Sequence, residues 1–264
     1  MLRWCAYCQR FEGEVPPFET YDVTHGLCAR CKDRGLEISD AEMERVQNIK
    51  AFQSRLWEAG RSGDQSQAES LLGLSLQMGL RPIDTLVGLV TPALWRVGRL
   101  WEERKMTVFE EHRFTAFCEQ LLALVALKTP AVSGGAPVLL LPAEGNIHTL
   151  GARMMHIWLS SLEQNAHCVF PGIPVREAAS LVWSVRPAVV GVSISMPDQL
   201  PQALELEKKL KDELGPECPP VVVGGFPVKM GRVAGSQPRA GESSAQMLIR
   251  LARERSVENF GKAL

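Results

Sequence analysis

The sequence predicts three consecutive folding units: a small zinc ribbon, an α-helical bundle and an α/β unit with a flavodoxin-like (Rossmann-like) parallel sheet. Two Cys-x-x-Cys pairs lie near the N-terminus, and the middle region carries helix-capping signals with apolar residues at helical spacing. The last part alternates short apolar runs with amphipathic segments. We place the three units at residues 1–37, 64–133 and 134–264, with a linker helix at 38–63.

Composition is that of an ordinary soluble protein. The chain has 264 residues, of which 45% are hydrophobic and 22% charged, and its formal net charge is −1. No run approaches the roughly 18 apolar residues of a membrane span, and the first residues do not form a signal peptide. We therefore expect a cytoplasmic protein that does not associate with membranes.

The first unit is predicted from cysteine spacing. Cys5-x-x-Cys8 and Cys28-x-x-Cys31 are separated by 19 residues, which fits the two knuckles of a zinc ribbon. Four thiolates at this spacing close a tetrahedron around zinc and replace a core that so short a segment cannot build. The alternative, two disulfides, is disfavoured in a cytoplasmic chain. The residues that flank these cysteines also resemble those of a small four-cysteine module that is appended to bacterial sensor and signalling proteins.

The charge of the predicted ribbon argues against nucleic acid as its partner. Residues 1–37 contain five Lys or Arg and six Asp or Glu, so the basic surface that phosphate binding needs is missing. We expect a protein-contact or structural role, and no direct DNA binding.

Helix signals follow in order. Capping boxes at Ser39–Glu42 and Thr107–Glu110 begin two helices, the first of which is broken at Gly60–Gly63. Two further helices are expected between these boxes. They run from Asp64 to Met78, and from Pro82 through Val97. The short connections predict a small bundle.

The α/β unit is predicted from four apolar runs, near 138–141, 167–170, 188–193 and 220–223, with helices between them and a last helix over Ser243–Arg255. Polar residues and glycines follow three of these runs. Since the carboxyl ends of parallel strands meet at one edge of a sheet, this edge is the expected ligand site. The segments at this edge are 143–151, 193–195 and 224–225.

The first of these groups, Asn146-x-His148-x-x-Gly151, resembles the Asp-x-His-x-x-Gly signature of cobalamin-binding domains. The resemblance implies that His148 is the lower ligand of cobalt and that Gly151 lets the backbone approach the corrin. One position departs from the signature. Asn146 replaces an Asp, and a neutral amide can hydrogen-bond the imidazole without raising its basicity as a carboxylate does. We therefore expect weaker or more reversible cobalt ligation.

Two later segments keep the order that this resemblance requires. Ser193-Ile194-Ser195 is similar to the element that flanks the dimethylbenzimidazole tail in these domains, and Gly224-Gly225 is similar to the pair that makes room for the nucleotide tail. Glycine suits a position where a ligand presses on the backbone.

In the bundle, Trp101-x9-Glu111-His112 resembles the helical cap of cobalamin-dependent photoreceptors of the CarH type. The resemblance, which covers about residues 64–228, implies that Trp101 and Glu111 lie beside the upper axial group, commonly 5′-deoxyadenosyl. Glu102 directly follows Trp101, where a cobalt-capturing His would be sought, and a carboxylate binds Co(III) more weakly than imidazole. His112 cannot be assigned the capturing role from the sequence. In addition, the ribbon stands where the photoreceptors carry a DNA-binding domain.

These resemblances imply a sensory or regulatory protein that binds adenosylcobalamin or methylcobalamin between cap and α/β unit and responds to light by photolysis of the Co–C bond. Signal transduction, transcription regulation through a regulatory protein partner, and homo-oligomerisation belong to this expectation. The alternative is a corrinoid methyl carrier that serves partner methyltransferases, because such carriers also place a helical bundle before this signature. A third reading is another tetrapyrrole, such as heme. No Ser-His-Asp or paired-carboxylate arrangement is legible, so we expect no enzymatic activity.

Overall fold

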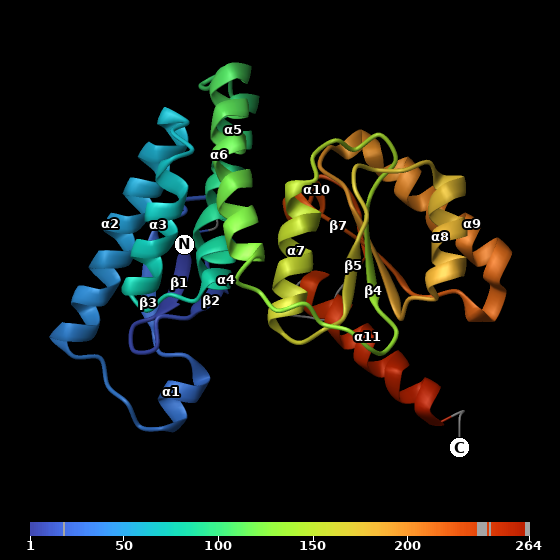
Figure 1. Cartoon of the computed structure of the whole chain (residues 1–264), viewed down its shortest axis with the longest axis horizontal. Helices are drawn as coiled ribbons and strands as arrows, with labels where there is room; N and C mark the ends of the chain where they lie inside the picture. The colour runs from blue at the N-terminus through green and yellow to red at the C-terminus, as the bar shows by residue number, and fades with distance from the viewer. Residues whose placement is uncertain (18, 237–241, 243, 262–264) are drawn as a thin grey trace. The chain divides into compact units, whose positions relative to one another are not determined.

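The computed structural model describes residues 1–17, 19–236, 242 and 244–261, and it divides the chain into two compact units, Met1–Lys128 and Thr129–Leu264 (Figure 1). The first unit contains β1 (Leu2–Cys5), β2 (Phe11–Glu14), β3 (Val23–Gly26), α1 (Ala29–Asp33), α2 (Asp40–Ser62), α3 (Gln67–Gln77), α4 (Pro82–Thr85), η1 (Leu86–Val90), α5 (Thr91–Glu102) and α6 (Val108–Ala126). The second contains β4 (Val138–Pro142), α7 (Leu150–Ser161), β5 (Ala166–Cys168), α8 (Val175–Val185), β6 (Val189–Ser193), η2 (Pro197–Gln199), α9 (Leu200–Leu214), η3 (Gly215–Glu217), β7 (Val221–Gly224), α10 (Phe226–Lys229) and α11 (Ser244–Gly261).

In the first unit, a three-stranded sheet and a helical bundle share one compact body. The sheet has the order β2-β1-β3, with β1 antiparallel to β2 and parallel to β3. Helix α6 packs against α2, α3 and α5, and α2 also contacts β3. The capping boxes predicted at Ser39 and Thr107 are confirmed, and α2 ends at a left-handed Gly63. The helix predicted as a linker, α2, therefore contributes a buried face to the bundle.

The third helix of the bundle differs from the sequence prediction. The helix predicted from Pro82 through Val97 is present, but it contains a π-helical turn (η1) between α4 and α5. The physical reason lies in a contact that is distant in sequence. Trp4 and Phe11 press on Gly88 in η1, where an added Cβ would come within 2.6 Å and 2.8 Å of their rings. Single-turn π-helices inside α-helices accommodate such local insertions.

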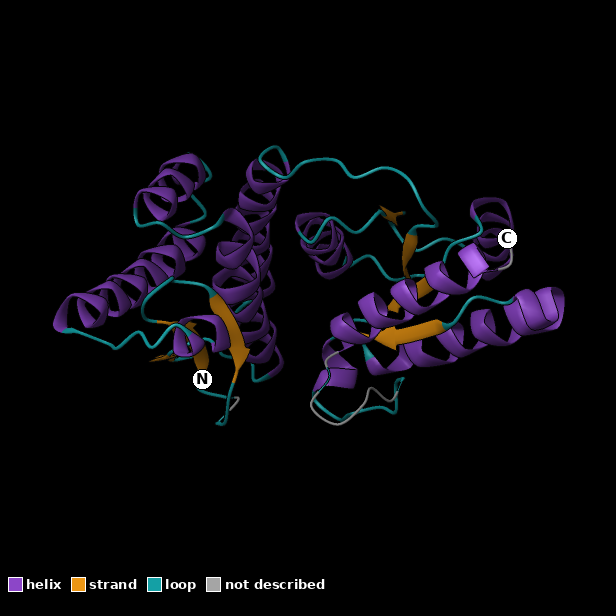
Figure 2. Cartoon of the chain, turned by 90° about the horizontal axis from the view of Figure 1, so that it is seen from below, coloured by secondary structure: helices purple, strands orange, loops and turns teal. Residues whose placement is uncertain are grey.

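The second unit is a parallel α/β sandwich, as predicted. All strand pairs are parallel and the order β5-β4-β6-β7 is that of a flavodoxin-like sheet. Leu139 and Leu141 pack with α8 and α9 on one face, while Val138 and Leu140 pack with α7 and α11 on the other. The strands lie between helices in both views (Figure 1, Figure 2). Because both faces are covered, the strands are continuous apolar runs.

The last helix, predicted from Ser243 to Arg255, is α11, and Leu248 and Ala252 on it are buried against the sheet. Ser243 itself lies outside the described residues. None of the helices that the structure describes combines the length and apolar character that a membrane span requires.

The packing of α2 on α6 generates a prediction for two glycines. A Cβ added at Gly60 would lie 2.4 Å from the Phe114 ring, whereas one at Gly73 in α3 would meet nothing within 4 Å. We expect Gly60→Ala to lower the free energy of unfolding of the helical unit by about 1–3 kcal/mol through overpacking. Gly73→Ala should raise it by about 0.5–1 kcal/mol through helix propensity. Urea unfolding followed by far-UV circular dichroism measures both, and equal effects of the two substitutions would contradict this packing.

Candidate functional site

The carboxyl edge of the second sheet brings together the loops that the sequence singles out. Strands β4 and β6 are neighbours, paired up to Pro142 and Ser193. The chain leaves β4 towards β5 on one side of it and leaves β6 towards β7 on the other. Connections that diverge in this way open a crevice at the strand ends, where ligands of such sheets bind. The loop that carries His148 follows β4 directly.

Asn146 links the loops at this edge through the hydrogen bonds of its side chain. Its side chain is fully buried. Nδ2 donates to the Ser193 carbonyl oxygen at 3.0 Å and to Ser195 Oγ at 3.2 Å, and Oδ1 accepts from the backbone N–H of His148 at 3.0 Å. The amide orientation is unambiguous because the carbonyl can only accept and the N–H can only donate. A buried amide with three partners is stabilised in this position.

The sequence suggests an amide contact with the imidazole of His148, and the structure places the contact elsewhere. Asn146 holds the backbone of His148, while the His148 side chain is exposed to solvent. Asn146 therefore positions the loop, and its amide atoms are engaged away from the ring. The exposed imidazole is accessible to a metal ion carried by a ligand in the crevice.

Two glycines of the candidate set have different physical roles. At Gly151, near the start of α7, an added Cβ would meet nothing within 4 Å, so no packing inside the protein requires glycine there. Gly225 has φ +126°, and a Cβ would lie 2.0 Å from the carbonyl oxygen of Ile194. The chain itself thus requires glycine at 225. Beside it, the carbonyl of Gly224 accepts from Ile194 N–H at 2.9 Å, which joins the ends of β6 and β7.

Two residues that the sequence reasoning missed support the loops at this edge. Gln199 Oε1 accepts from the backbone N–H groups of Ser195 and Met196 at 2.8 and 3.1 Å. Gly172 N–H donates to the Asn146 carbonyl at 3.2 Å, and a Cβ there would lie 1.9 Å from the Ala143 carbonyl oxygen. Pro171-Gly172 is a turn signal that could have drawn attention to this loop, whereas Gln199 carries no such signal.

The remaining predicted residues lie in the helical unit. Trp101 stands at the end of α5 and is 41% exposed. On α6, Glu111 is half-buried and accepts from Thr115 Oγ1 at 2.8 Å, and His112 Nε2 lies 3.4 Å from Glu111 Oε2. Glu110 is used differently, because it completes the capping box at Thr107. Glu111 and His112 thus form a side-chain pair on the surface of α6.

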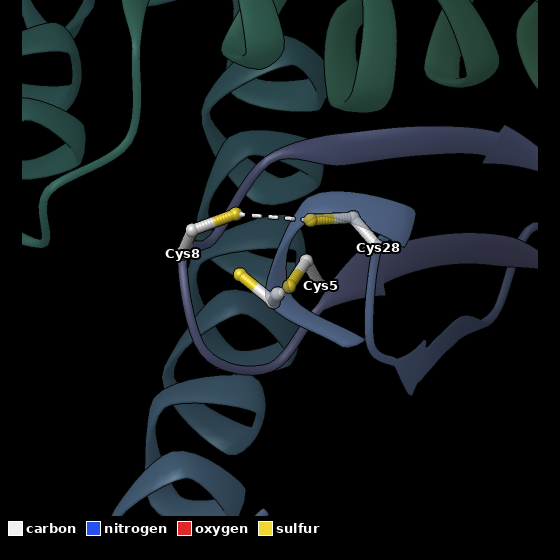
Figure 3. A group of neighbouring side chains, drawn as sticks. Cys5, Cys8 and Cys28 are labelled. Atoms are coloured by element: carbon white, nitrogen blue, oxygen red, sulfur yellow. Dashed lines mark hydrogen bonds between the residues drawn. The ribbon is translucent and has the colours of Figure 1, made fainter. Parts of the chain in front are cut away.

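The four N-terminal cysteines converge, as their spacing predicts (Figure 3). Cys5 ends β1 and Cys8 lies in the turn that follows, whereas Cys28 and Cys31 lie at the first turn of α1. All four sulfur atoms lie within 4.8 Å of one another and none forms a disulfide. The Cys8 and Cys28 sulfurs are 3.8 Å apart. Two thiolates on a tetrahedral zinc ion with bonds of about 2.3 Å would be about 3.8 Å apart.

The electrostatics of this cluster favours a bound cation. Burial, together with the neighbouring thiols, raises the pKa of Cys8 to about 12. Burial also acts to raise the pKa of Cys5, but backbone N–H groups including those of Cys8 and Cys28 outweigh it and bring this pKa to about 7. The thiols therefore ionise as a coupled group in which one thiolate discourages the next. Four thiolates this close coexist only around a positive ion.

A comparison with known protein families finds a match within the helical unit. Residues 53–125, from within α2 to near the end of α6, match the family described as B12 binding domain. Within the helical unit, this stretch is similar to that domain. No curated protein matches the chain.

Solved structures extend the comparison to both units. The monomethylamine corrinoid protein of Methanosarcina barkeri is similar with a TM-score of 0.64 and 14% identity, covering 76% of this chain and 96% of that one. The methanol:cobalamin methyltransferase complex MtaBC from Methanosarcina barkeri gives a TM-score of 0.39 at 17% identity, with coverages of 75% and 83%. A cobalamin-binding protein from Desulfitobacterium hafniense DCB-2 gives 0.39 at 18%, with coverages of 76% and 97%. The first of these shows a shared fold, a helical bundle followed by a parallel α/β unit.

The hydrogen bonds of Asn146 predict a pH-dependent cost for restoring the signature residue. In Asn146→Asp, a carboxylate oxygen would face the Ser193 carbonyl oxygen that now lies 3.0 Å from Nδ2. Burial and this repulsion raise the pKa of the new carboxyl in the folded state above its unfolded value of about 3.9. The variant should therefore be close to wild type at about pH 4 and lose about 1–3 kcal/mol of stability as the pH rises to about 7.

Urea unfolding of the ligand-free protein at both pH values measures this loss. Asn146→Ala serves as the control, because it removes the same hydrogen bonds without adding a charge and should be destabilised about equally at the two pH values. A loss for Asn146→Asp that does not depend on pH would contradict the assignment of Nδ2 to Ser193.

Proposed function

We propose that this protein binds cobalamin and that His148 is the axial ligand of the cobalt. The observation that carries the proposal is the B12 binding domain match at residues 53–125, followed in the same chain by an exposed His148 at the switch point of a parallel sheet. The surrounding residues fit this group. Gly151 leaves open space beside the histidine, as a large planar macrocycle would need, and the imidazole is free of burial.

The chain's own residues prepare this edge for the ligand. Asn146 fixes the backbone of His148, and Gln199 fixes the backbone of Ser195, so that loops from β4 and β6 are ordered in advance. Preorganised loops lower the entropic cost of binding. When bound, cobalamin supplies a cobalt centre that carries a transferable and light-sensitive alkyl group.

We infer that the protein acts as a corrinoid carrier, which receives and delivers an alkyl group in contact with a partner methyltransferase. Support comes from the monomethylamine corrinoid protein of Methanosarcina barkeri, which has the same two-part fold over 96% of its length. The exposed position of His148 is consistent with this role, because a carrier must present its cofactor to another protein.

A light-responsive sensor is the second candidate. It is favoured by the pair of Glu111 and His112 on α6 and by the exposed Trp101 at the end of α5, the residues on which the resemblance to the CarH type rests. In this reading, the change at the upper axial position alters contacts with a regulatory protein or a second copy of the chain. Differential contact with the two states would supply the coupling free energy.

We also propose that the four cysteines hold Zn²⁺. Four thiolates suit zinc. The four sulfur atoms lie within 4.8 Å of one another, and the 3.8 Å between those of Cys8 and Cys28 matches two ligands of one zinc ion. Iron is the competing ion for four thiolates. Elemental analysis of the purified protein, with about one zinc per chain expected, distinguishes the two.

Cobalt ligation by His148 can be tested through the nitrogen nucleus. Protein produced with ¹⁵N-labelled histidine and loaded with Co(II) cobalamin should show a doublet in its paramagnetic resonance spectrum, where unlabelled protein shows a triplet. The splitting reports the axial nitrogen directly, so it separates His148 from the benzimidazole of the cofactor. His148→Ala should lose the doublet and His112→Ala, the matched control, should keep it. A triplet from labelled wild type would refute His148 as ligand.

Carrier and sensor make different predictions for assembly. Protein loaded in the dark with adenosylcobalamin or methylcobalamin is passed over a size-exclusion column before and after green light. For the carrier we expect photolysis of the cofactor without a change in elution. A shift in elution that Trp101→Ala abolishes would instead establish the sensor, whereas Trp183→Ala, which removes another exposed Trp in the α/β unit, is the control that should keep the shift.

A further inference from the structure

The cysteine module, residues 2–33, is built into the helical unit. The buried side chains of the module continue into those of the bundle, and the two form one compact body. Arg45 of α2 donates to the carbonyl of Tyr7, which lies between the two cysteines of the first pair, at 3.3 Å. Three further contacts join the module to the residues matched by the B12 binding domain.

The first contact is apolar and lies at η1. Trp4, which is fully buried, and Phe11 stack with ring centroids 5.4 Å apart, and both rings press on Gly88. Trp4 directly precedes the metal-ligating Cys5 in the sequence. The π-helical turn that holds Gly88 runs on without a break into α5, which carries Trp101.

The second contact is at the start of α4, where the buried carboxylate of Asp84 pairs with a half-exposed Arg81. Asp84 is only 2% exposed and receives two hydrogen bonds from Arg81, at 2.6 and 2.7 Å. Burial raises the pKa of the Asp84 carboxyl, whereas the Arg81 guanidinium and a hydrogen bond from the backbone of Phe11 oppose this rise. A strand residue of the module thus helps to satisfy a charge inside the bundle. Losing this donor would leave a buried carboxylate less well paired.

The third contact involves the segment before β3. Arg99 of α5 donates to the Glu19 carbonyl at 3.0 Å and stacks over the Tyr21 ring at 5.2 Å. Gln53 of α2 donates to the Tyr21 carbonyl at 2.8 Å. The module therefore joins α2 to α5 through neighbouring residues of one short segment.

We propose that Zn²⁺ bound by the four cysteines is a structural ion for the whole B12 binding domain, and that its binding holds η1 and α5 in their folded positions. The module is too short to build a sufficient core of its own, so its fold depends on the ion as well as on its packing against the bundle. Each of the three contacts starts from a module residue whose position depends on that fold. Loss of the ion therefore weakens the contacts of Gly88, Asp84 and Arg99 with the module together.

The proposal rests on the zinc site and is independent of cobalamin, so the test uses the cofactor-free full chain. Backbone hydrogen exchange is compared between zinc-loaded protein and protein stripped with a chelator under reducing conditions. We expect exchange in η1 and α5 to accelerate by at least about tenfold on zinc removal and to recover when zinc is restored. Strands β4 and β6 of the second unit provide the internal control and should keep their protection.

Two glycine variants distinguish the effect of the zinc ion from the effect of the contact at Gly88. Gly88→Ala should bind zinc normally, as elemental analysis would show, yet exchange faster in α5 because its methyl group displaces Trp4 and Phe11. Gly98→Ala in α5 is the matched control, since a Cβ there would meet nothing within 4 Å. If zinc removal accelerates exchange only within residues 2–33, the ion serves the module alone and the proposal fails. Failure of the chain to bind zinc would overturn it as well.

Discussion

The buried amide of Asn146 holds the carboxyl ends of β4 and β6 together, and the position of His148 depends on it. Ser193 receives two hydrogen bonds at this point, from the Asn146 side chain and from the backbone of Ala143. Both donors belong to the segment that follows β4, so hydrogen bonds tie this segment to the end of β6. A neutral amide can donate to a carbonyl and accept from a backbone N–H at once, which a carboxylate cannot. The hydrogen bonds within the protein therefore account for Asn at this position, whatever ligand binds at this edge.

Much of the fold could be predicted from local patterns, because those patterns have local causes. Capping boxes mark helix starts through hydrogen bonds within one turn, and strands covered on both faces are continuous apolar runs. The π-helical turn at η1 could not be predicted, since its cause is the approach of Trp4 and Phe11 from about 80 residues away. The hydrogen-bond partners of Asn146 could not be predicted either, because sequence spacing does not reveal where a side chain points.

The glycines at the candidate site show how far a motif can be interpreted without coordinates. A resemblance attributes Gly225 to room for a nucleotide tail, yet the carbonyl of Ile194 already excludes any side chain there. Gly151 is different, because the protein leaves the space beside it open. Open space alone does not indicate a ligand, since Gly73 and Gly98 are equally unrestricted, but Gly151 follows the exposed His148 by three residues. The weight of the cobalamin proposal therefore rests on Gly151 and His148 more than on the Gly224-Gly225 pair.

The two proposed ligands act on different compact units, and this separates their effects. The edge that carries His148 is ordered by hydrogen bonds within the second unit, and its sheet is buried between its own helices. The helices that match the B12 binding domain family, by contrast, contact the cysteine module at Gly88 and through Arg99. Loss of the metal should therefore loosen the helical unit while His148 keeps its place. Any coupling between metal and cofactor must then arise from what the helices contribute to cobalamin binding, because the axial ligand does not depend on the cysteines.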